Sequence, residues 1–525
     1  MALIMLASPI SLESSDRARR GLSLVRVLVV IVVIGLVGAG LVARWYYGRR
    51  VHLTSEWEPF LGERGPAMAM GDAIGTDGQT AMRVGDDDIL FRVDGDSAGD
   101  YFGFAVAALG DLNGDGIPDF AVGAHQNENY GERPAPNAPP GYARVFSGAD
   151  GSEMYTLHPT GSAKIDGADD HFGWSIAAID DLDGDGAAEI AVGAYLFDAE
   201  EDEDDDFDEN TGATLLFSGA TGEQIHLFGG DTWGDRFGYL VSSFPDRDGD
   251  GKNDLLIAVE KSETRDAVVN AGGVEIWSSS SFEQLVRSDG PGWEAHLGSS
   301  IATIGDVNAD GVADFAAGAF MFAAKEESEA HRGAAGVFSG QTGEVLMAWE
   351  GAGHYDHLGF SIVGLGDVNG DGIDDVAIGA NQSGWAGDYF GPGYVRVHSC
   401  ADGALLDVLR GGEEGDQFGW MIANGGDRNG DGVDDLLVGA PSSVTATENL
   451  ARHGRVYVYS GSDRALLKAF EGPELDDQFG VAAAALGDLD GDGLSEVLVG
   501  APQNVSGQTK AGYAVVVSGR VFDAR

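Results

Sequence analysis

The stretch Asp427-Arg428-Asn429-Gly430-Asp431-Gly432-Val433-Asp434-Asp435, followed by Leu436-Leu437-Val438-Gly439-Ala440-Pro441, carries the pattern that decides the fold. Its first nine residues place carboxylate or amide side chains at positions one, three, five and nine, around a glycine that permits a tight turn. The same pattern opens at seven aspartates, spaced 70, 65, 60, 61, 60 and 61 residues apart: Asp111, Asp181, Asp246, Asp306, Asp367, Asp427 and Asp488. A repeat of tens of residues dictates the architecture, so we expect seven similar units.

Each unit contains four short segments with the alternation and glycine punctuation of β-strands. In unit six we predict strands at 420–424, 435–439, 455–459 and 466–470, and a hairpin turn at 460–463. Four antiparallel strands make one blade of a β-propeller, and radial repetition leaves only short, protected sheet edges. The predicted fold class is therefore all-β: a seven-bladed β-propeller of four-stranded antiparallel blades at residues 89–525, preceded by one N-terminal transmembrane helix.

The chain also contains a spare strand that would close the ring. Only residues 520–525 follow the third strand of unit seven, at 513–517, so that unit lacks a full outer strand. The segment 89–95 precedes the first unit and ends in a glycine seven residues before a Phe-Gly pair, as the fourth strands of five other units do. We predict that residues 89–95 form the outer strand of the last blade.

A Phe-Gly or Leu-Gly pair stands nine residues before each opening aspartate: Phe102-Gly103, Phe172-Gly173, Phe237-Gly238, Leu297-Gly298, Leu358-Gly359, Phe418-Gly419 and Phe479-Gly480. With the apolar runs that end in Gly-Ala, these pairs resemble the FG-GAP repeat of integrin α-subunit propellers, over nearly all of residues 89–519. Unit three departs from the pattern, because it has Ala258-Val259-Glu260 in place of Gly-Ala-Pro. By analogy, the resemblance implies an adhesion or ligand-binding module.

The acidic loops are candidate metal sites. Ca²⁺ takes six to eight oxygen ligands, and a glycine-bearing turn folds alternate side chains inward. Positions one, three, five and nine would supply side chains and position seven a carbonyl: Asp111, Asn113, Asp115, Ile117 and Asp119; Asp181, Asp183, Asp185, Ala187 and Glu189; Asp246, Asp248, Asp250, Lys252 and Asp254; Asp306, Asn308, Asp310, Val312 and Asp314; Asp367, Asn369, Asp371, Ile373 and Asp375; Asp427, Asn429, Asp431, Val433 and Asp435; Asp488, Asp490, Asp492, Leu494 and Glu496.

These ligand sets favour up to seven structural Ca²⁺ ions over other metal sites. An EF-hand needs a glutamate at position twelve and a following helix, whereas here the ninth position is acidic and a strand follows. Soft metals are excluded because the ligand positions hold neither cysteine nor histidine. Extracellular calcium modules bind with dissociation constants of roughly 10⁻⁴–10⁻³ M, which a resting cytosol could not saturate. We therefore expect the propeller to lie outside the cytosol.

The composition limits the partners. The formal net charge is -55, from 86 acidic and 31 basic residues, which excludes nucleic acid as a partner of the main body. A single cysteine, Cys400, excludes an intrachain disulfide, so bound metal is the candidate stabiliser.

The N-terminal region reads as a membrane anchor. We predict a basic leader at 1–21, a transmembrane helix at 22–44 and a linker or stalk at 45–88. Residues 27–43 are seventeen consecutive apolar or glycine positions, just enough to span a bilayer, and a cleaved signal peptide is the competing reading. Residues 21–35 also resemble the prepilin N-terminus of type IV pilins, which implies cleavage after Gly21, although Arg26 stands where most members carry glutamate.

The partner surface is predicted on the face opposite the calcium loops, because strand two delivers its variable loops there and rigid scaffolds often carry function on such loops. These loops are 125–140, 195–211, 261–271, 320–332, 381–392, 442–453 and 503–511. Trp385, Tyr389 and Phe390 could stack on sugars. The acidic run 198–209 is a solvated insertion or a docking strip for a basic partner.

The chain lacks the common catalytic motifs. It contains no H-E-x-x-H and no G-x-S-x-G, and its densest histidine cluster, at 354–357, reads as a surface turn. We predict a non-enzymatic module that binds an unknown protein or glycan. A pilin-like surface or secretion component and a glycan-active propeller enzyme are the alternatives.

Overall fold

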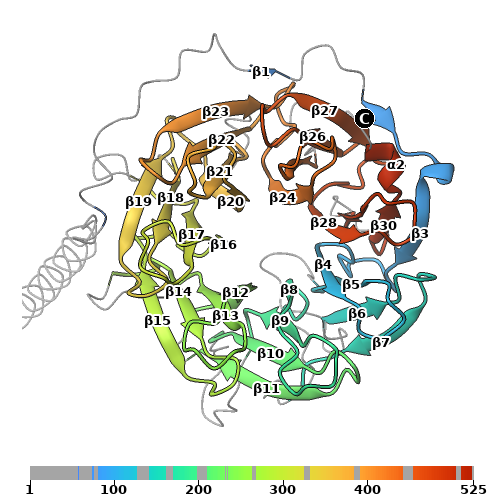
Figure 1. Ribbon diagram of the computed structural model, residues 1–525, viewed down its shortest axis with the longest axis horizontal. Helices are drawn as coiled ribbons and strands as arrows, with labels where there is room; N and C mark the ends of the chain where they lie inside the picture. The colour runs from blue at the N-terminus through green and yellow to red at the C-terminus, as the bar shows by residue number, and fades with distance from the viewer. Residues whose placement is uncertain are drawn as a thin grey trace, which may run out of the picture. The chain divides into compact units, whose positions relative to one another are not determined.

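The computed structural model describes residue 57, residues 74–75, and residues 81–126, 141–160, 170–197, 210–230, 232, 234–262, 268–323, 331–383, 391–441, 453–503 and 510–522. Over these residues the chain forms seven antiparallel sheets arranged radially around a central axis (Figure 1). The predicted all-β, seven-bladed propeller is confirmed. The predicted anchor at 22–44 lies outside the described residues, and among those residues no helix is long and apolar enough to cross a bilayer.

Each blade has four antiparallel strands, and in blades one to six these lie from the axis outward in chain order (Figure 1). The strands of blades one to three are β4 (Ala105–Gly110), β5 (Asp119–Ala124), β6 (Tyr142–Phe146) and β7 (Glu153–Leu157); β8 (Ser175–Ala178), β9 (Ile190–Ala194), β10 (Ala213–Phe217) and β11 (Gln224–Gly229); β12 (Phe237–Phe244), β13 (Asp254–Val259), β14 (Gly273–Trp277) and β15 (Gln284–Asp289). Those of blades four to six are β16 (Ser300–Ile304), β17 (Asp314–Ala319), β18 (Ala334–Phe338) and β19 (Val345–Glu350); β20 (Leu358–Gly366), β21 (Asp375–Ala380), β22 (Tyr394–Ser399) and β23 (Leu405–Arg410); β24 (Met421–Gly426), β25 (Asp435–Ala440), β26 (Arg455–Tyr459) and β27 (Leu466–Glu471).

Blade seven joins the two ends of the propeller. It contains β28 (Ala482–Gly487), β29 (Glu496–Ala501), β30 (Tyr513–Val517) and, as its outer strand, β3 (Ile89–Asp94). Strand β3 pairs antiparallel with β30, with Asp94 opposite Tyr513. The predicted closing strand is therefore confirmed, and the first blade follows it directly in the chain.

The hydrophobic core is divided among the seams between blades. Seven clusters of buried side chains occur, and each draws its members from two neighbouring blades. The second strand of a blade is the most enclosed; all six residues of β5, β13, β17, β21, β25 and β29 are buried. Such a strand reads as a continuous apolar run because both of its faces pack against other blades.

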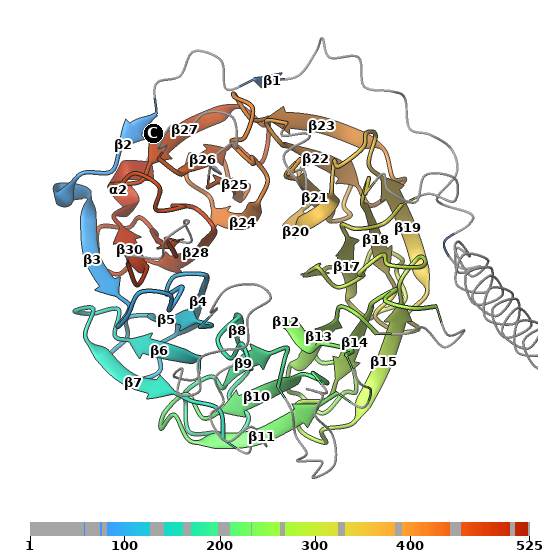
Figure 2. The same ribbon diagram turned by 180° about the vertical axis from the view of Figure 1, so that it is seen from behind.

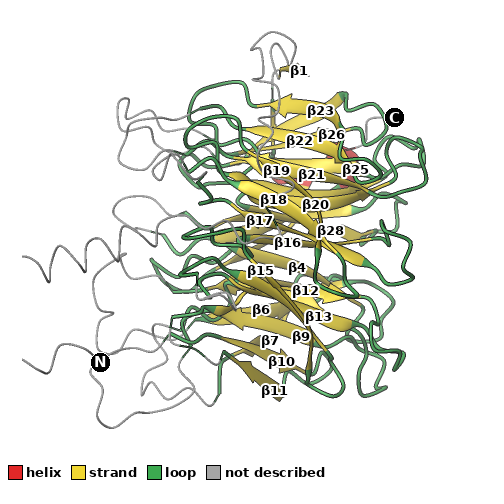
Figure 3. Ribbon diagram, turned by 90° about the vertical axis from the view of Figure 1, so that its left-hand side faces the viewer, coloured by secondary structure: helices red, strands yellow, loops and turns green. Residues whose placement is uncertain are grey.

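The strand direction gives the ring two distinct faces (Figures 2 and 3). In each blade the first strand begins at or just after the Phe-Gly or Leu-Gly pair and ends at the acidic loop. A six-residue strand spans roughly 20 Å. The second strand returns, so that in blade one His125, just after β5, meets Phe104, just before β4, with ring centroids 4.6 Å apart. The acidic loops thus lie on one face, and the residues that follow the Phe-Gly pairs lie on the other.

Part of the segment 45–88, which the sequence predicts as a linker, contacts the propeller. Strand β1 (Ile74–Gly75) pairs parallel with β23, and β2 (Met82–Arg83) pairs parallel with β27. A 3₁₀ turn, η1 (Asp86–Asp88), then leads into β3, and a short helix, α2 (Gly519–Phe522), ends the described chain. Strands of two residues produce no periodicity, so sequence patterns give no sign of these contacts.

The residue that breaks the Gly-Ala-Pro pattern in unit three, Glu260, forms buried charged contacts in the structure. Glu260 is 3% exposed; it accepts a hydrogen bond from Arg236 Nη1 at 3.1 Å and contacts Nδ1 of His296. Although burial works against it, the charge and hydrogen bond of Glu260 raise the pKa of His296 to about 9. Burial likewise opposes the shift at Glu260, where His296 and Arg236 lower the pKa to about 2. A buried carboxylate with two cationic partners thus stands where the Gly-Ala-Pro pattern has proline.

We expect His296→Gln to destabilise the propeller by about 3 kcal/mol near pH 6, because the substitution leaves Glu260 buried with one fewer partner. The raised pKa of His296 contributes stability that is complete below pH 6.5 and is lost as the pH rises through about 9. The lowered pKa of Glu260 contributes stability above pH 4.5 that is lost as the pH falls through about 2. The difference in the free energy of unfolding between wild type and His296→Gln should therefore be largest between about pH 4.5 and pH 6.5, and it should shrink toward pH 9.5.

Urea unfolding from pH 5.5 to 9.5 measures this difference. The exposed His354, changed to glutamine, is the matched control. A difference between wild type and His296→Gln that stays constant over this range would contradict the ion pair.

Candidate functional site

Seven acidic loops, each joining strands one and two of a blade, gather on one face of the ring. All the predicted ligand positions lie in described residues. In every loop the position-six glycine amide donates to the opening aspartate, at 2.7–3.0 Å. In every loop the position-seven amide donates to the position-five carboxylate, at 2.8–3.0 Å. The loops therefore share one geometry.

The first loop shows how this geometry turns the side chains inward. One carboxylate oxygen of Asp111 accepts the amide of Gly114 at 2.7 Å, and the other accepts the amide of Gly116 at 2.8 Å. The amide of Asp115 donates to the side-chain oxygen of Asn113 at 2.9 Å. The first Asp111 oxygen also accepts the amide of Asp115 at 3.1 Å, whereas the second Asp111 oxygen and the Asn113 oxygen each have a further lone pair for another partner. These backbone hydrogen bonds thus hold the side-chain oxygens of positions one, three and five in place before any cation binds.

The ninth position carries a carboxylate that is buried in all seven loops, at most 1% exposed. One of its oxygens accepts the amide of position two, at 2.6–3.0 Å in every loop. In blades one, three, four, six and seven the other oxygen accepts an amide that follows strand three, at 3.0–3.4 Å. This side chain therefore connects the acidic loop to the outer half of its own blade.

Burial raises the pKa of all seven ninth-position carboxyls, and the other carboxylates of the same loop add to the shift. For Asp254, Asp314 and Asp375 the pKa is about 6. Backbone hydrogen bonds act in the opposite direction without cancelling the burial. A cation in the loop would offset the repulsion among these carboxylates and lower their pKa values, because it would neutralise their charge.

In three loops the carboxylates already converge. Oxygen atoms of three acidic side chains lie within 4.8 Å of one another in these groups: Asp181, Asp183 and Glu189; Asp246, Asp248 and Asp250; Asp488, Asp490 and Asp492. The donors are all oxygen, and hard cations such as Ca²⁺ prefer flexible sets of carboxylates, amides and carbonyls. The residues present therefore fit a calcium ion at each loop.

Cationic side chains of the chain itself contact several of the loops, Lys252 and Arg520 among them. The ammonium of Lys252, in loop three, contacts the backbone carbonyl of Asp181 in loop two. In blade seven, Nε of Arg520 donates to Asp492 at 2.6 Å. These contacts join loop two to loop three and loop seven to the last described helix.

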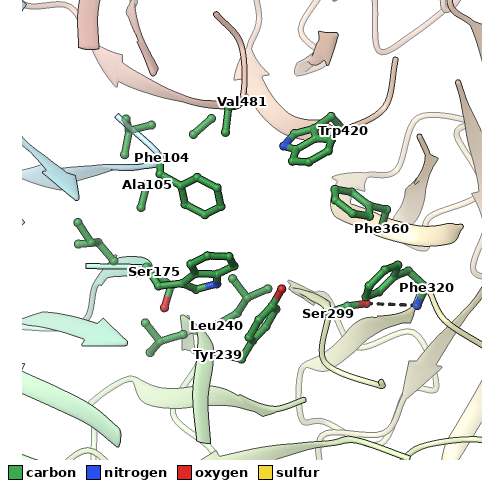
Figure 4. Close-up of a pocket in the computed structure, with 15 residues that line it drawn as sticks. Phe104, Ala105, Ser175, Tyr239, Leu240, Ser299, Phe320, Phe360, Trp420 and Val481 are labelled. Carbon is green, nitrogen blue, oxygen red and sulfur yellow. Dashed lines mark hydrogen bonds between the residues drawn. The ribbon is translucent and has the colours of Figure 1, made fainter. Parts of the chain in front are cut away.

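On the opposite face a cavity of about 280 Å³ lies on the ring axis (Figure 4). All seven blades contribute to its lining, chiefly through the residue that follows the Phe-Gly or Leu-Gly pair: Phe104, Trp174, Tyr239, Ser299, Phe360, Trp420 and Val481. None of the fifteen lining residues carries a charged side chain. The cavity is therefore an apolar site at the centre of a strongly acidic protein.

The aromatic lining residues form two arcs. In the first, the ring centroids of Phe104 and Trp174 are 4.4 Å apart and those of Trp174 and Tyr239 are 5.4 Å apart. In the second, Phe360 lies 5.5 Å from Phe320 and 4.7 Å from Trp420. Sequence reasoning missed this site, although a signal exists: the residue after the pair is aromatic in five of the seven units.

Comparison with known proteins supports the repeat assignment. The FG-GAP repeat model matches residues 102–132, 172–217, 359–398, 418–459 and 479–517, which lie in units one, two, five, six and seven. Integrin alpha-5 of Xenopus laevis is 31% identical over 182 residues, covering 33% of this chain and 16% of that protein. Integrin alpha-PS2 of Drosophila melanogaster is 34% identical over 154 residues, with 28% and 10% covered.

Human integrin alpha-IIb is 35% identical over 178 residues, covering 31% of this chain and 16% of the relative. The aligned part of this chain thus spans a sixth or less of the length of these relatives.

Loop four contains one strained residue. At position four the other six loops have glycine, whereas loop four has Ala309, with a φ of 61°. Left-handed backbone brings the Cβ atom of an L-residue close to its own carbonyl oxygen, which destabilises the fold.

We expect Ala309→Gly to stabilise the protein by about 0.5–1 kcal/mol, because the relief of this strain exceeds the entropy that glycine adds to the unfolded chain. The reverse change in loop five, Gly370→Ala, should destabilise the protein, because Gly370 has a φ of 81°. An added Cβ there would meet no other atom, so the effect would come from the backbone conformation alone. Urea unfolding at fixed calcium measures both variants. Equal midpoints for wild type and Ala309→Gly would rule out the strain.

Proposed function

We propose that this integrin alpha-like FG-GAP β-propeller is a calcium-stabilised binding or adhesion module outside the cytosol, which holds a protein or glycan ligand on the face opposite its calcium loops. The observation that carries the proposal is the apolar cavity on the ring axis, lined by all seven blades. The predicted segment 22–44 would tether the module to a membrane.

The cavity has the features of an anchor point for a ligand. Large aromatic residues that are rigidly held dominate binding energies, because they bury much area with little loss of side-chain freedom. The arc residues lie just before or within the first strands, except Phe320, which directly follows β17, and their rings contact one another. Tyr239 and Ser299 add hydroxyl groups at the wall. A side chain or sugar ring that enters the cavity would meet a preformed surface.

The composition of the cavity favours binding over catalysis. Its fifteen lining residues include no carboxylate, histidine, lysine or cysteine, so within the lining the hydroxyl groups of Ser175, Tyr239 and Ser299 have none of the usual activating partners. Propeller enzymes exist, and the fold alone does not decide the function.

Calcium and ligand binding would be coupled through the first strands. Each first strand carries a cavity residue at one end and an acidic loop at the other. Ions in the loops would offset the repulsion among the carboxylates and fix the ends of these strands. Millimolar calcium is available outside the cytosol, which supports that location for the propeller.

We expect the full chain in detergent to bind up to seven Ca²⁺ ions and to melt at a higher temperature in millimolar calcium than in EDTA. Each occupied loop should add roughly 1–3 kcal/mol at 10 mM calcium, given the affinities typical of extracellular modules. Asp371→Asn should lower the bound calcium, measured by elemental analysis after dialysis, by one ion.

The matched control for Asp371→Asn is Asp402→Asn, since Asp402 lies in the outer turn of the same blade and accepts the amide of Ala404. The control should keep the full number of ions. A wild-type protein that carries no metal and melts identically with and without EDTA would refute the calcium part of the proposal.

We further expect Trp174→Ala and Trp420→Ala, one from each arc, each to weaken the binding of a ligand at least tenfold, because each removes a central aromatic contact. The full chain is screened against glycan and extracellular-protein arrays in calcium, and the strongest ligand is titrated against each variant. Trp349→Ala is the control: Trp349 lies on β19, away from the cavity, and donates to the carbonyl of Gly403. Unchanged affinity of both cavity variants would place the ligand elsewhere.

A further inference from the structure

We propose that Trp57 is a plug that fastens the chain preceding the first blade to the outside of the ring, at the seam between blades three and four. The contacts of β1, β2 and β3 then continue this attachment around blades five, six and seven. We call Trp57, β1 and residues 81–94 the rim segment. It forms a second clasp of the ring, in addition to the closing strand.

Trp57 is held as a core residue although it lies 232 residues away from its hydrogen-bond partner. Its side chain is fully buried and belongs to the cluster that joins blades three and four. The indole Nε1 donates to the carbonyl of Asp289, at the end of β15 in blade three, at 3.2 Å. Its ring meets Phe338 of blade four edge to face, with centroids 5.5 Å apart. The indole N–H thus has a hydrogen-bond partner, and the ring packs against apolar side chains.

Gly336 supplies the space for this indole. It is the third residue of β18, and a Cβ atom there would lie 2.8 Å from Cη2 of Trp57. The third strands of the other six blades have side chains at this position: Arg144, Leu215, Glu275, Arg396, Tyr457 and Val515. The cross-strand neighbour on the outer strand, Ala348, is also small. Glycine inside a strand weakens the strand and marks a close approach by another group.

The rim segment contacts the outer strands of successive blades (Figures 1 and 2). In β1, Ile74 pairs with Leu409 of blade five, and in β2, Met82 pairs with Phe470 of blade six. Val84 is 3% exposed, and its amide donates to the carbonyl of Glu471 at 3.1 Å. Strand β3 then completes blade seven. With the contacts of Trp57 to blades three and four, the rim segment therefore contacts five consecutive blades.

This arrangement protects the closing strand. An outer strand at a chain end frays first, because its hydrogen bonds open without disturbing others. Here the chain before β3 is tied at blades six, five and four, so a pull on the preceding chain reaches Trp57 before it reaches β3. A force applied through the proposed tether would therefore act first on the buried indole of Trp57, and the hydrogen bonds between β3 and β30 would stay intact.

Hydrogen exchange by mass spectrometry on the full chain, in calcium, tests this role. Trp57→Ala and Gly336→Leu should each raise exchange at least tenfold in β18 and in residues 81–88, because the first removes the plug and the second fills its site. The double variant should restore slow exchange in β18, where leucine then packs as Leu215 does in blade two, but not in residues 81–88. Trp57→Phe should fall between wild type and Trp57→Ala.

Trp349→Ala is the matched control, since it removes a tryptophan from the same blade without touching the rim segment. It should leave the exchange of residues 81–88 unchanged. If Trp57→Ala alters exchange only in β18, or nowhere, the plug does not hold the rim segment and the proposal is overturned. Equal effects of Trp57→Ala and Trp349→Ala on residues 81–88 would overturn it as well, since the effect would then be a general loss of stability.

Discussion

The buried carboxylate at the ninth position of each acidic loop is the constraint on which the blade depends. It accepts the second amide of its own loop in every blade, and in five blades it also accepts an amide that follows strand three. One side chain thus holds the inner and outer halves of the sheet at the same face. A carboxylate in such a place is costly to bury as an anion, and its neighbours in the loop are also acidic. A divalent cation bound in the loop would resolve this conflict.

The repeat also explains why the two faces have different chemistry. Every first strand starts next to the axis with the residue after the Phe-Gly or Leu-Gly pair and ends in a set of carboxylates. Radial repetition therefore collects apolar rings on one face and oxygen donors on the other. With cations bound, the acidic face would stabilise the scaffold, and the aromatic face offers a preformed surface. A change in the loops would reach the cavity through the length of a single strand.

The sequence predicted the features that are periodic and missed those that depend on ring closure. The number of blades, the strands of unit six to within two residues, and the closing strand at 89–95 followed from spacing alone. The ligand positions were equally regular, and the structure places them in one geometry. The cavity was not predicted, because its residues are about sixty positions apart and meet only after the ring closes. The contacts of Trp57 and of β1 were not predicted either, since an isolated tryptophan and a two-residue strand carry no period.

The irregular features of the chain concentrate in blades three and four, and each has an identifiable cause or consequence. Glu260 stands where the repeat pattern has proline and is paired with Arg236 and His296. Ala309 holds a backbone conformation that glycine holds in the other loops. Gly336 leaves the space that Trp57 fills. Units three and four are also those outside the five matched repeat ranges.

A repeat protein gains most of its stability from identical interfaces, so substitutions that break the pattern persist where a specific contact replaces the general one. The seam between blades three and four has such contacts in an ion pair and an inserted indole. This seam therefore departs from the general repeat pattern, and Trp57 from the chain before the propeller is buried in it.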